Sequence, residues 1–274
     1  MEILQSWLVA PFTYAFMVRA LAVSVLVGVM CPLLGTYVVT RDLGFMSDAL
    51  AHSVMPGVVA AVLVGLHPLW GAVPSAIVIA LLLGWLVHST GLSADTTIGI
   101  LFAGLFALGV ALLPLVRHVS LNLEDLLLGQ VLGASQVDVM VTAILTAVVA
   151  AVLYGLHSRL LFVSFDPLGA KVAGLSATRL DYLFLMLLAV ATVTALQAVG
   201  IILVISLLIT PAAAALLVTR TFEHAMFLSA GFGVSATVVG LYASYHLNVA
   251  SGPVMALVAT AIFAVAYAVA AARR

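Results

Sequence analysis

Long apolar runs separated by single charged residues constrain this chain more than any other feature. Of its 274 residues, 65% are hydrophobic, whereas only nine are Lys or Arg and ten are Asp or Glu. Soluble domains spend about a quarter of their residues on charge, so a charged share of 7% cannot cover a water-facing surface. The sequence therefore predicts an all-α polytopic membrane protein in which residues 1–274 form a single transmembrane domain.

The few charged residues mark where each apolar run ends. A membrane-spanning helix needs about 20 apolar residues, so we expect eight or nine transmembrane helices. The run 180–219 is about twice as long as one crossing, and we expect it to cross and return. Its return leg, 199–219, is predicted to break near Pro211, and it either spans fully or is re-entrant. The other apolar runs are 20–40, 44–66, 69–87, 96–116, 137–156, 225–247 and 254–272.

The stretch 120–135 is too short and too polar to cross the membrane. Its apolar residues recur at helical spacing, at Leu123, Leu126, Leu127 and Val131. We therefore expect a short interfacial or re-entrant helix between the fourth and fifth crossings.

The distribution of basic residues predicts the orientation. Nine crossings place the two termini on opposite sides, and the side richer in Lys and Arg faces the cytoplasm. With the N-terminus outside and the C-terminus in the cytoplasm, only Arg19 and Arg117 lie outside. We therefore expect a multi-pass protein of the cytoplasmic membrane, surrounded by lipid, whose cytoplasmic basic residues are Arg41, Arg159, Lys171, Arg179, Arg220, Arg273 and Arg274.

Two ionisable residues lie inside the second apolar run. Such a residue costs about 2.5–3.5 kcal/mol on membrane-insertion scales, which makes it a functional-site hypothesis. Asp48 and His52 stand four residues apart, so both side chains share one helix face and can bind one cation together. The alternative is an internal hydrogen bond that only orients helices. A carboxylate at this depth needs a positive partner, however, and no Lys or Arg shares its run.

One Asp and one His are too few for a divalent transition metal, which usually takes four to six ligands. A homodimer with both residues on its twofold axis would present two carboxylates and two imidazoles, a set that suits Mn(II), Fe(II) or Zn(II). Met55, three residues beyond His52, is either a soft apolar gate on the same face or a packing residue. The only cysteine, Cys31, excludes thiolate clusters, and we expect no permanently bound cofactor.

Residues 158–179 form the longest polar connection, on the predicted cytoplasmic side. Asp166 before Pro167 suits the start of a helix and Gly174 suits its end, so we expect a short helix here. The chain has no GxxxxGK[ST] motif and cannot bind ATP by a P-loop. A short helix in a cytoplasmic loop is suited to docking into a separate ATPase, and an ordinary basic connection is the alternative.

Six blocks of sequence occur in a recognisable order from Arg41 to about Pro253. They are RDLGFMSDALAHSVMPG, DTTIGI, LLLGQVLG, FDPLGAKVAGL, GIILVISLLITPAAAALLVTR and SGP. Together they resemble the membrane permease subunit of manganese, zinc and iron-type ABC transporters. The DALAHSVMPG and LLITPAA blocks are the specific ones, and the others are compatible with the family.

The resemblance implies a homodimeric permease of an ABC importer, a transport subunit and not an enzyme, that moves a divalent metal. It also implies two cytoplasmic ATPase subunits and an extracytoplasmic protein that delivers the metal, with manganese slightly favoured over iron and zinc. The family's metal residues match Asp48 and His52. Its ATPase-docking loop matches 165–175, where the corresponding residues are Phe165, Asp166, Pro167, Ala170, Lys171 and Gly174.

Other classes of function fit less well. An ion-coupled secondary transporter would use Asp48 as a proton carrier, and inverted repeats would favour it, but the two halves show no convincing internal similarity. A purely structural membrane subunit leaves the cost of Asp48 and His52 unexplained. The net charge of −1 gives no reason to expect a nucleic-acid partner.

Overall fold

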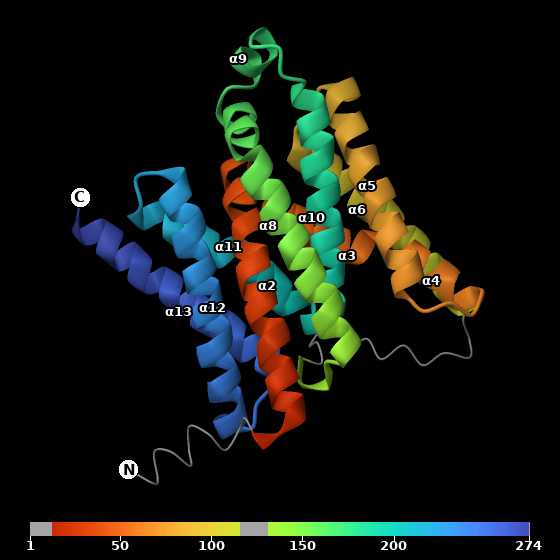
Figure 1. The fold of residues 1–274 in the computed structure, drawn as a ribbon. Coiled ribbons are helices and arrows are strands. Elements are labelled where there is room, and N and C mark those ends of the chain that lie inside the picture. Colours follow the sequence, from red (N-terminus) through yellow and green to blue (C-terminus); the bar gives the residue numbers. More distant parts are fainter. Residues whose placement is uncertain (1–12, 116–130, 274) are drawn as a thin grey trace. The chain divides into compact units, whose positions relative to one another are not determined.

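A computed structural model of the protein describes residues 13–115 and 131–273 (Figure 1). These residues are helical and contain no strand, and nine helical segments among them are long and apolar enough to cross a membrane. The predicted all-α membrane fold is therefore confirmed. The expected helix at 120–135 lies mostly outside the described residues, and its described end is a 3₁₀ turn, Val131–Gly133.

The chain divides into two compact units. Among the described residues, unit 1 comprises 13–36, 131–148 and 195–273, and unit 2 comprises 37–115 and 149–194. The long helices α2 (Ala15–Thr40), α8 (Gln136–Phe165) and α10 (Ala177–Val199) each contribute to both units.

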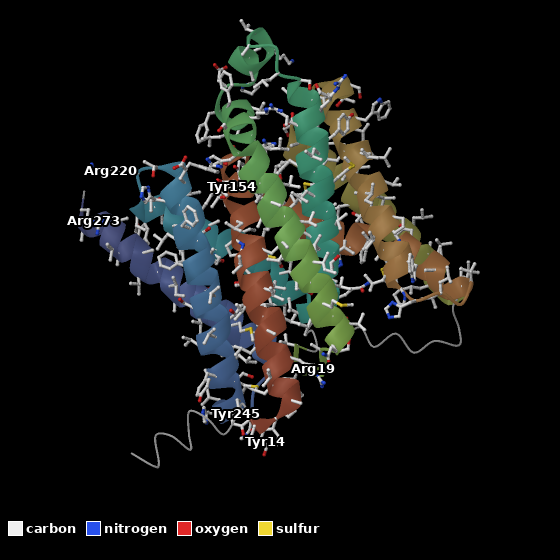
Figure 2. The ribbon with its side chains drawn as sticks, viewed as in Figure 1. Tyr14, Arg19, Tyr154, Arg220, Tyr245 and Arg273 are labelled. Carbon is white, nitrogen blue, oxygen red and sulfur yellow. The ribbon has the colours of Figure 1, made fainter. Side chains whose placement is uncertain are left out.

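Unit 1 is built around α11 (Ile201–Val218), α12 (Phe222–Leu247) and α13 (Ser251–Ala272), which pack against one another. Helix α2 crosses α12 where Gly28 faces Gly233, and a Cβ atom on either glycine would clash with the backbone carbonyl of the other. Small residues at such a crossing let two membrane helices approach closely. The residues at the two ends of unit 1 are labelled in Figure 2, with Arg220 and Arg273 at the end opposite to Tyr14, Arg19 and Tyr245.

Unit 2 contains α3 (Met46–Ser53), α4 (Met55–Leu63), α5 (Leu69–Thr90) and α6 (Ala94–Leu112). It also contains the short helix α9 (Pro167–Val172), which follows α8. The second apolar run was expected as one helix, but it is divided at Val54. Pro56, in the first turn of α4, has no N–H to donate to the preceding turn, and its ring crowds that turn.

The run 180–219 forms two helices, α10 and α11, as expected for a run of twice the spanning length, and each is long and apolar enough to cross a membrane. They are joined at Gly200, whose φ of +87° is a conformation that favours glycine. The predicted break near Pro211 is wrong, since α11 continues through this residue. A proline removes only one backbone hydrogen bond, and the buried position of Pro211 lets neighbouring helices hold α11 in place.

Helix α8 is longer than the predicted run 137–156 and continues to Phe165. Leu160 and Val163 are buried in this extension, so residues 158–165 have an apolar face that continues the helix. The polar connection was predicted at 158–179, but residues 158–165 belong to α8. The connection between α8 and α10 is therefore limited to residues 166–176, which contain α9.

Candidate functional site

Asp48 and His52 lie side by side on α3. The Nε2 atom of His52 is 3.6 Å from Oδ1 of Asp48, and their side chains are 28% and 33% exposed, respectively. This separation is longer than a hydrogen bond, so the carboxylate and the imidazole are not hydrogen-bonded to each other. The two groups therefore lie close together without a hydrogen bond joining them.

In the second apolar run, the two candidate ligands and Met55 are more exposed than the residues around them on α3. Positions 46, 47, 49, 50, 51, 53 and 54 are buried, whereas Asp48, His52 and Met55 are only half-buried. Asp48 and His52 have the spacing i and i+4, which is one face of α3, and Met55 follows as the first residue of α4. The two candidate ligands and the candidate gate are thus partly exposed, unlike their buried neighbours on α3.

Helix α6 packs against His52 and Met55. The His52 ring lies 5.9 Å from the ring of Phe102 and 5.4 Å from that of Phe106, measured between centroids. The two phenyl rings stack on each other with an angle of 8° between their planes. One turn further along α6, a Cβ atom on Gly109 would meet Met55 and Pro56. The imidazole is therefore confined by an aromatic wall, and the α3–α4 junction lies directly against the α6 backbone.

Asp48 and His52 have no third candidate ligand beside them in the part of the chain that the structure describes. Within residues 13–115 and 131–273, no three His, Cys, Asp or Glu side chains come together in a way that could hold a metal ion. Asp48 and His52 would supply only two ligands, whereas protein sites for divalent transition metals usually have four or more.

The predicted docking helix is α9, which lies beyond the ends of α8 and α10 in Figure 1. Its start is capped by Asp166, whose Oδ1 accepts a hydrogen bond of 2.8 Å from the Gly169 N–H. Its end is followed by Gly174 with a φ of +80°, a conformation that favours glycine. The helix start and stop predicted at Asp166, Pro167 and Gly174 are therefore present.

The docking segment, residues 165–175, has a buried side and an exposed side. Ala170 is fully buried against Val163 of α8 and Ala177 of α10. In contrast, Phe165, Leu168 and Val172 are 66%, 75% and 90% exposed. Ala170 therefore anchors the segment to its flanking helices, while three apolar side chains face outward next to the exposed Lys171.

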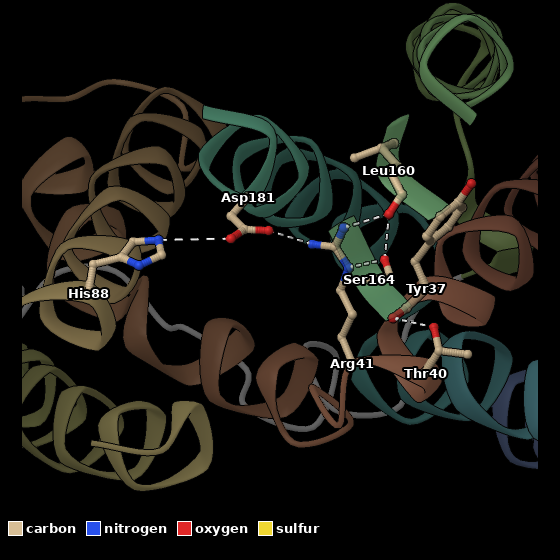
Figure 3. Close-up of polar contacts among 7 residues, drawn as sticks. All are labelled: Tyr37, Thr40, Arg41, His88, Leu160, Ser164 and Asp181. Carbon is tan, nitrogen blue, oxygen red and sulfur yellow. Dashed lines mark hydrogen bonds and ion pairs between the residues drawn. The ribbon is translucent and has the colours of Figure 1, made fainter. Parts of the chain in front are cut away.

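The sequence pattern did not single out Asp181, which forms an ion pair with Arg41 (Figure 3). Nη1 of Arg41 lies 3.0 Å from Oδ1 of Asp181, and the Arg41 side chain is only 11% exposed. Burial lowers the pKa of the Arg41 guanidinium, and Asp181 opposes that shift. The available signal was an acidic residue at the start of an apolar run, which needs a cationic partner. That signal alone does not identify a partner 140 residues away.

Comparison with known proteins identifies the relatives of this chain. Residues 13–270 match the family described as the ABC 3 transport family. The chain is 37% identical over 255 residues to the "Manganese transport system membrane protein MntC" of Halalkalibacterium halodurans, covering 93% of this chain and 87% of the relative. It is 34% identical over 262 residues to the "Probable iron transport system membrane protein" of Haemophilus influenzae, covering 96% of both chains.

A solved structure has the same fold. The chain matches one from "PsaBC from Streptococcus pneumoniae in complex with Fab" with a TM-score of 0.84 and 31% identity, covering 96% of this chain and 95% of the other. These matches confirm the resemblance found in the six sequence blocks, and with it the expectation of a transport subunit of the membrane and not an enzyme. The protein is a member of the ABC 3 transport family.

Proposed function

We propose that this protein is the permease of an importer that moves a divalent transition metal across the cytoplasmic membrane, with Mn(II) favoured over Fe(II) and Zn(II). The observation that carries this proposal is the Asp48–His52 pair, 3.6 Å apart on a half-buried face of α3. Relatives named for manganese and iron transport support the choice of cargo.

Two protomers complete the proposed site. Asp48 and His52 from each copy together provide two carboxylates and two imidazoles. These four groups are enough to coordinate one divalent ion. Oxygen and nitrogen ligands suit Mn(II) and Fe(II), and the single cysteine is buried. Because the metal is cargo, a site divided between two chains has an advantage: separation of the protomers weakens binding and releases the ion.

Met55 is the proposed gate beside this site. It follows His52 and is likewise half-buried, and its side chain lies against α6 at Gly109. A methionine side chain is apolar, flexible and a weak sulfur ligand, so it can close the path without binding a hard cation strongly. The ion then passes only when the helices around Met55 move apart.

The docking segment is the proposed contact with a cytoplasmic ATPase dimer. Phe165, Leu168 and Val172 offer an exposed apolar surface, and Asp166 and Lys171 add charges at its edge. This assignment places the N-terminus outside and the C-terminus in the cytoplasm, in agreement with the positive-inside rule. An extracytoplasmic binding protein would then deliver the metal on the opposite side.

Uptake of radioactive manganese into proteoliposomes that contain the permease, its ATPase and the metal-delivering binding protein tests the proposal. We expect Asp48→Asn or His52→Gln to lower uptake by more than about ten-fold, because losing a ligand costs at least as much as losing its supporting partner. Asp95→Asn is the matched control, since Asp95 is exposed at the start of α6. Normal uptake by both ligand variants would overturn the metal site. Uptake driven by a proton gradient without ATP would instead favour an ion-coupled carrier.

A further inference from the structure

One guanidinium joins the helices on both sides of the docking segment. Nε of Arg41 donates to Oγ of Ser164 at 2.8 Å, and Nη2 donates to the Leu160 carbonyl at 3.3 Å, both on the last turns of α8. Nη1 donates to Asp181 at 3.0 Å, and the guanidinium carbon lies 4.6 Å from the centre of the Phe184 ring, both on α10. Figure 3 shows the guanidinium with Leu160, Ser164 and Asp181.

The same arginine stands at the start of the turn that leads into α3. The Leu43 N–H bonds the Val38 carbonyl at 2.9 Å and the Asp42 N–H bonds the Val39 carbonyl at 3.4 Å, with Asp42 at a φ of +55°. This pattern is a Schellman turn, which ends α2 in a fixed geometry. Helix α3 begins three residues after Leu43, so a displacement of the Arg41 backbone moves the start of the helix that carries Asp48.

On the other side, the docking segment is bound to the two helices that Arg41 contacts. Ala170 packs with Val163 and Ala177, and Leu175 and Leu180 lie against them. A force on α9 therefore reaches the end of α8 and the start of α10 together. Ser164 follows Val163 directly, and Asp181 lies one helical turn after Ala177.

The link to α10 depends on the ion pair more than the link to α8 does. Helices α2 and α8 are also joined by the Tyr37 hydroxyl and Nδ1 of His157 at 2.9 Å. Between Arg41 and α10, Asp181 supplies the polar contact, and its second oxygen lies 3.9 Å from Nε2 of His88 on the last turn of α5. The Arg41–Asp181 pair thus brings the ends of α2, α5, α8 and α10 to one point within unit 2.

We propose that Arg41, paired with Asp181, is the positioning residue that transmits displacement of the docking segment to the helix bearing Asp48 and His52. This inference rests on the proposed function of both elements. An arginine suits the task because its planar group holds several donors in a rigid fork. Three partners on two helices therefore cannot move apart while the fork stays bound. Coupling through such a residue is established only by a measured change in coupling.

The test compares metal moved per ATP hydrolysed, in proteoliposomes that contain the assembled importer. Arg41→Ala alone leaves the Asp181 carboxylate without its partner and risks misfolding. The double variant Arg41→Met with Asp181→Leu replaces both charges by apolar groups of similar size, a change that buried ion pairs often tolerate. Arg41→Lys keeps the charge but loses the fork. Arg19→Met is the control, because Arg19 is also partly buried and donates to a backbone carbonyl, that of Ala134.

We expect the double variant to assemble, bind manganese and hydrolyse ATP, while the metal moved per ATP falls by about ten-fold. The metal moved per ATP should fall by less in Arg41→Lys, and it should not change in Arg19→Met. A normal ratio in the double variant would overturn the proposal. Failure of both Arg41 variants to assemble, or fewer complexes that each keep a normal ratio, would also overturn it and leave Arg41 a structural role only.

The same assay separates this inference from the proposed function. If Asp48 and His52 are not metal ligands, Asp48→Asn keeps normal manganese binding and uptake. If only the inference about Arg41 is wrong, Asp48→Asn loses uptake while the Arg41 variants keep a normal ratio of metal to ATP. The two failures therefore give different results.

Discussion

The imidazole of His52 lies edge-on to the ring of Phe106, with centroids 5.4 Å apart and 68° between the ring planes. Phe106 stacks on Phe102, which contacts Phe45 in turn at 6.2 Å. The aromatic wall from α6 thus limits the rotation of the imidazole next to Asp48. A ligand held in one orientation loses less conformational entropy when it binds a metal.

We expect Phe106→Ala to weaken manganese binding without removing a ligand. An aromatic pair contributes about 0.5–1.5 kcal/mol beyond its buried area, which corresponds to an increase in Kd of about two- to ten-fold. Titration of the purified importer with manganese measures this change. Phe227→Ala is the matched control, since Phe227 is 80% exposed on α12. Equal affinities for the two variants would show that the wall does not position His52.

Two glycines on α6 should respond in opposite ways to the same substitution. A Cβ atom on Gly109 would press on Met55 and Pro56, whereas a Cβ atom on Gly104 would meet nothing. We expect Gly109→Ala to destabilise the protein by about 1–3 kcal/mol through overpacking. Gly104→Ala should be neutral or stabilising, because an alanine inside a helix is more favourable than a glycine by about 1 kcal/mol of folding free energy. Thermal unfolding in detergent measures both, and a stable Gly109→Ala protein would contradict the close α6 contact.

The exposed side of the docking segment should govern binding of the ATPase. Leu168→Asp and Val172→Asp place a charge in an apolar surface, so we expect less ATPase to co-purify while the thermal stability of the permease is unchanged. Val137→Asp is the control, because Val137 is also exposed but lies at the other end of α8. Ala170→Leu should act differently and lower stability, since Ala170 has no free space around it. Full ATPase recovery with both Asp variants would place the docking surface elsewhere.

Thiol labelling tests the orientation in the membrane. In a Cys31→Ser background, a cysteine replacing Ser176 should be shielded from an impermeant reagent in intact cells, because we place the docking segment in the cytoplasm. A cysteine replacing Leu66, exposed between α4 and α5, should react. The reverse pattern would put the docking segment outside, where no cytoplasmic ATPase could reach it.

The features that the sequence alone determined are local ones. Crossings follow from the length of each apolar run, because every backbone polar group must be satisfied inside the bilayer by its own helix. The contact between Asp48 and His52 follows from a spacing of four residues. The start of α9 at Asp166 and its stop at Gly174 follow from cap chemistry within a few residues.

Tertiary structure alone decided which distant residues contact each other and whether a proline interrupts its helix. Asp181 finds Arg41, 140 residues away, and Phe106 finds His52, because helix packing brings those faces together, and no pattern along the chain specifies it. The two prolines show the same limit, since Pro56 accompanies a break at Val54 whereas Pro211 leaves α11 continuous. One missing hydrogen bond costs little, so the packing around each proline determines whether the helix continues.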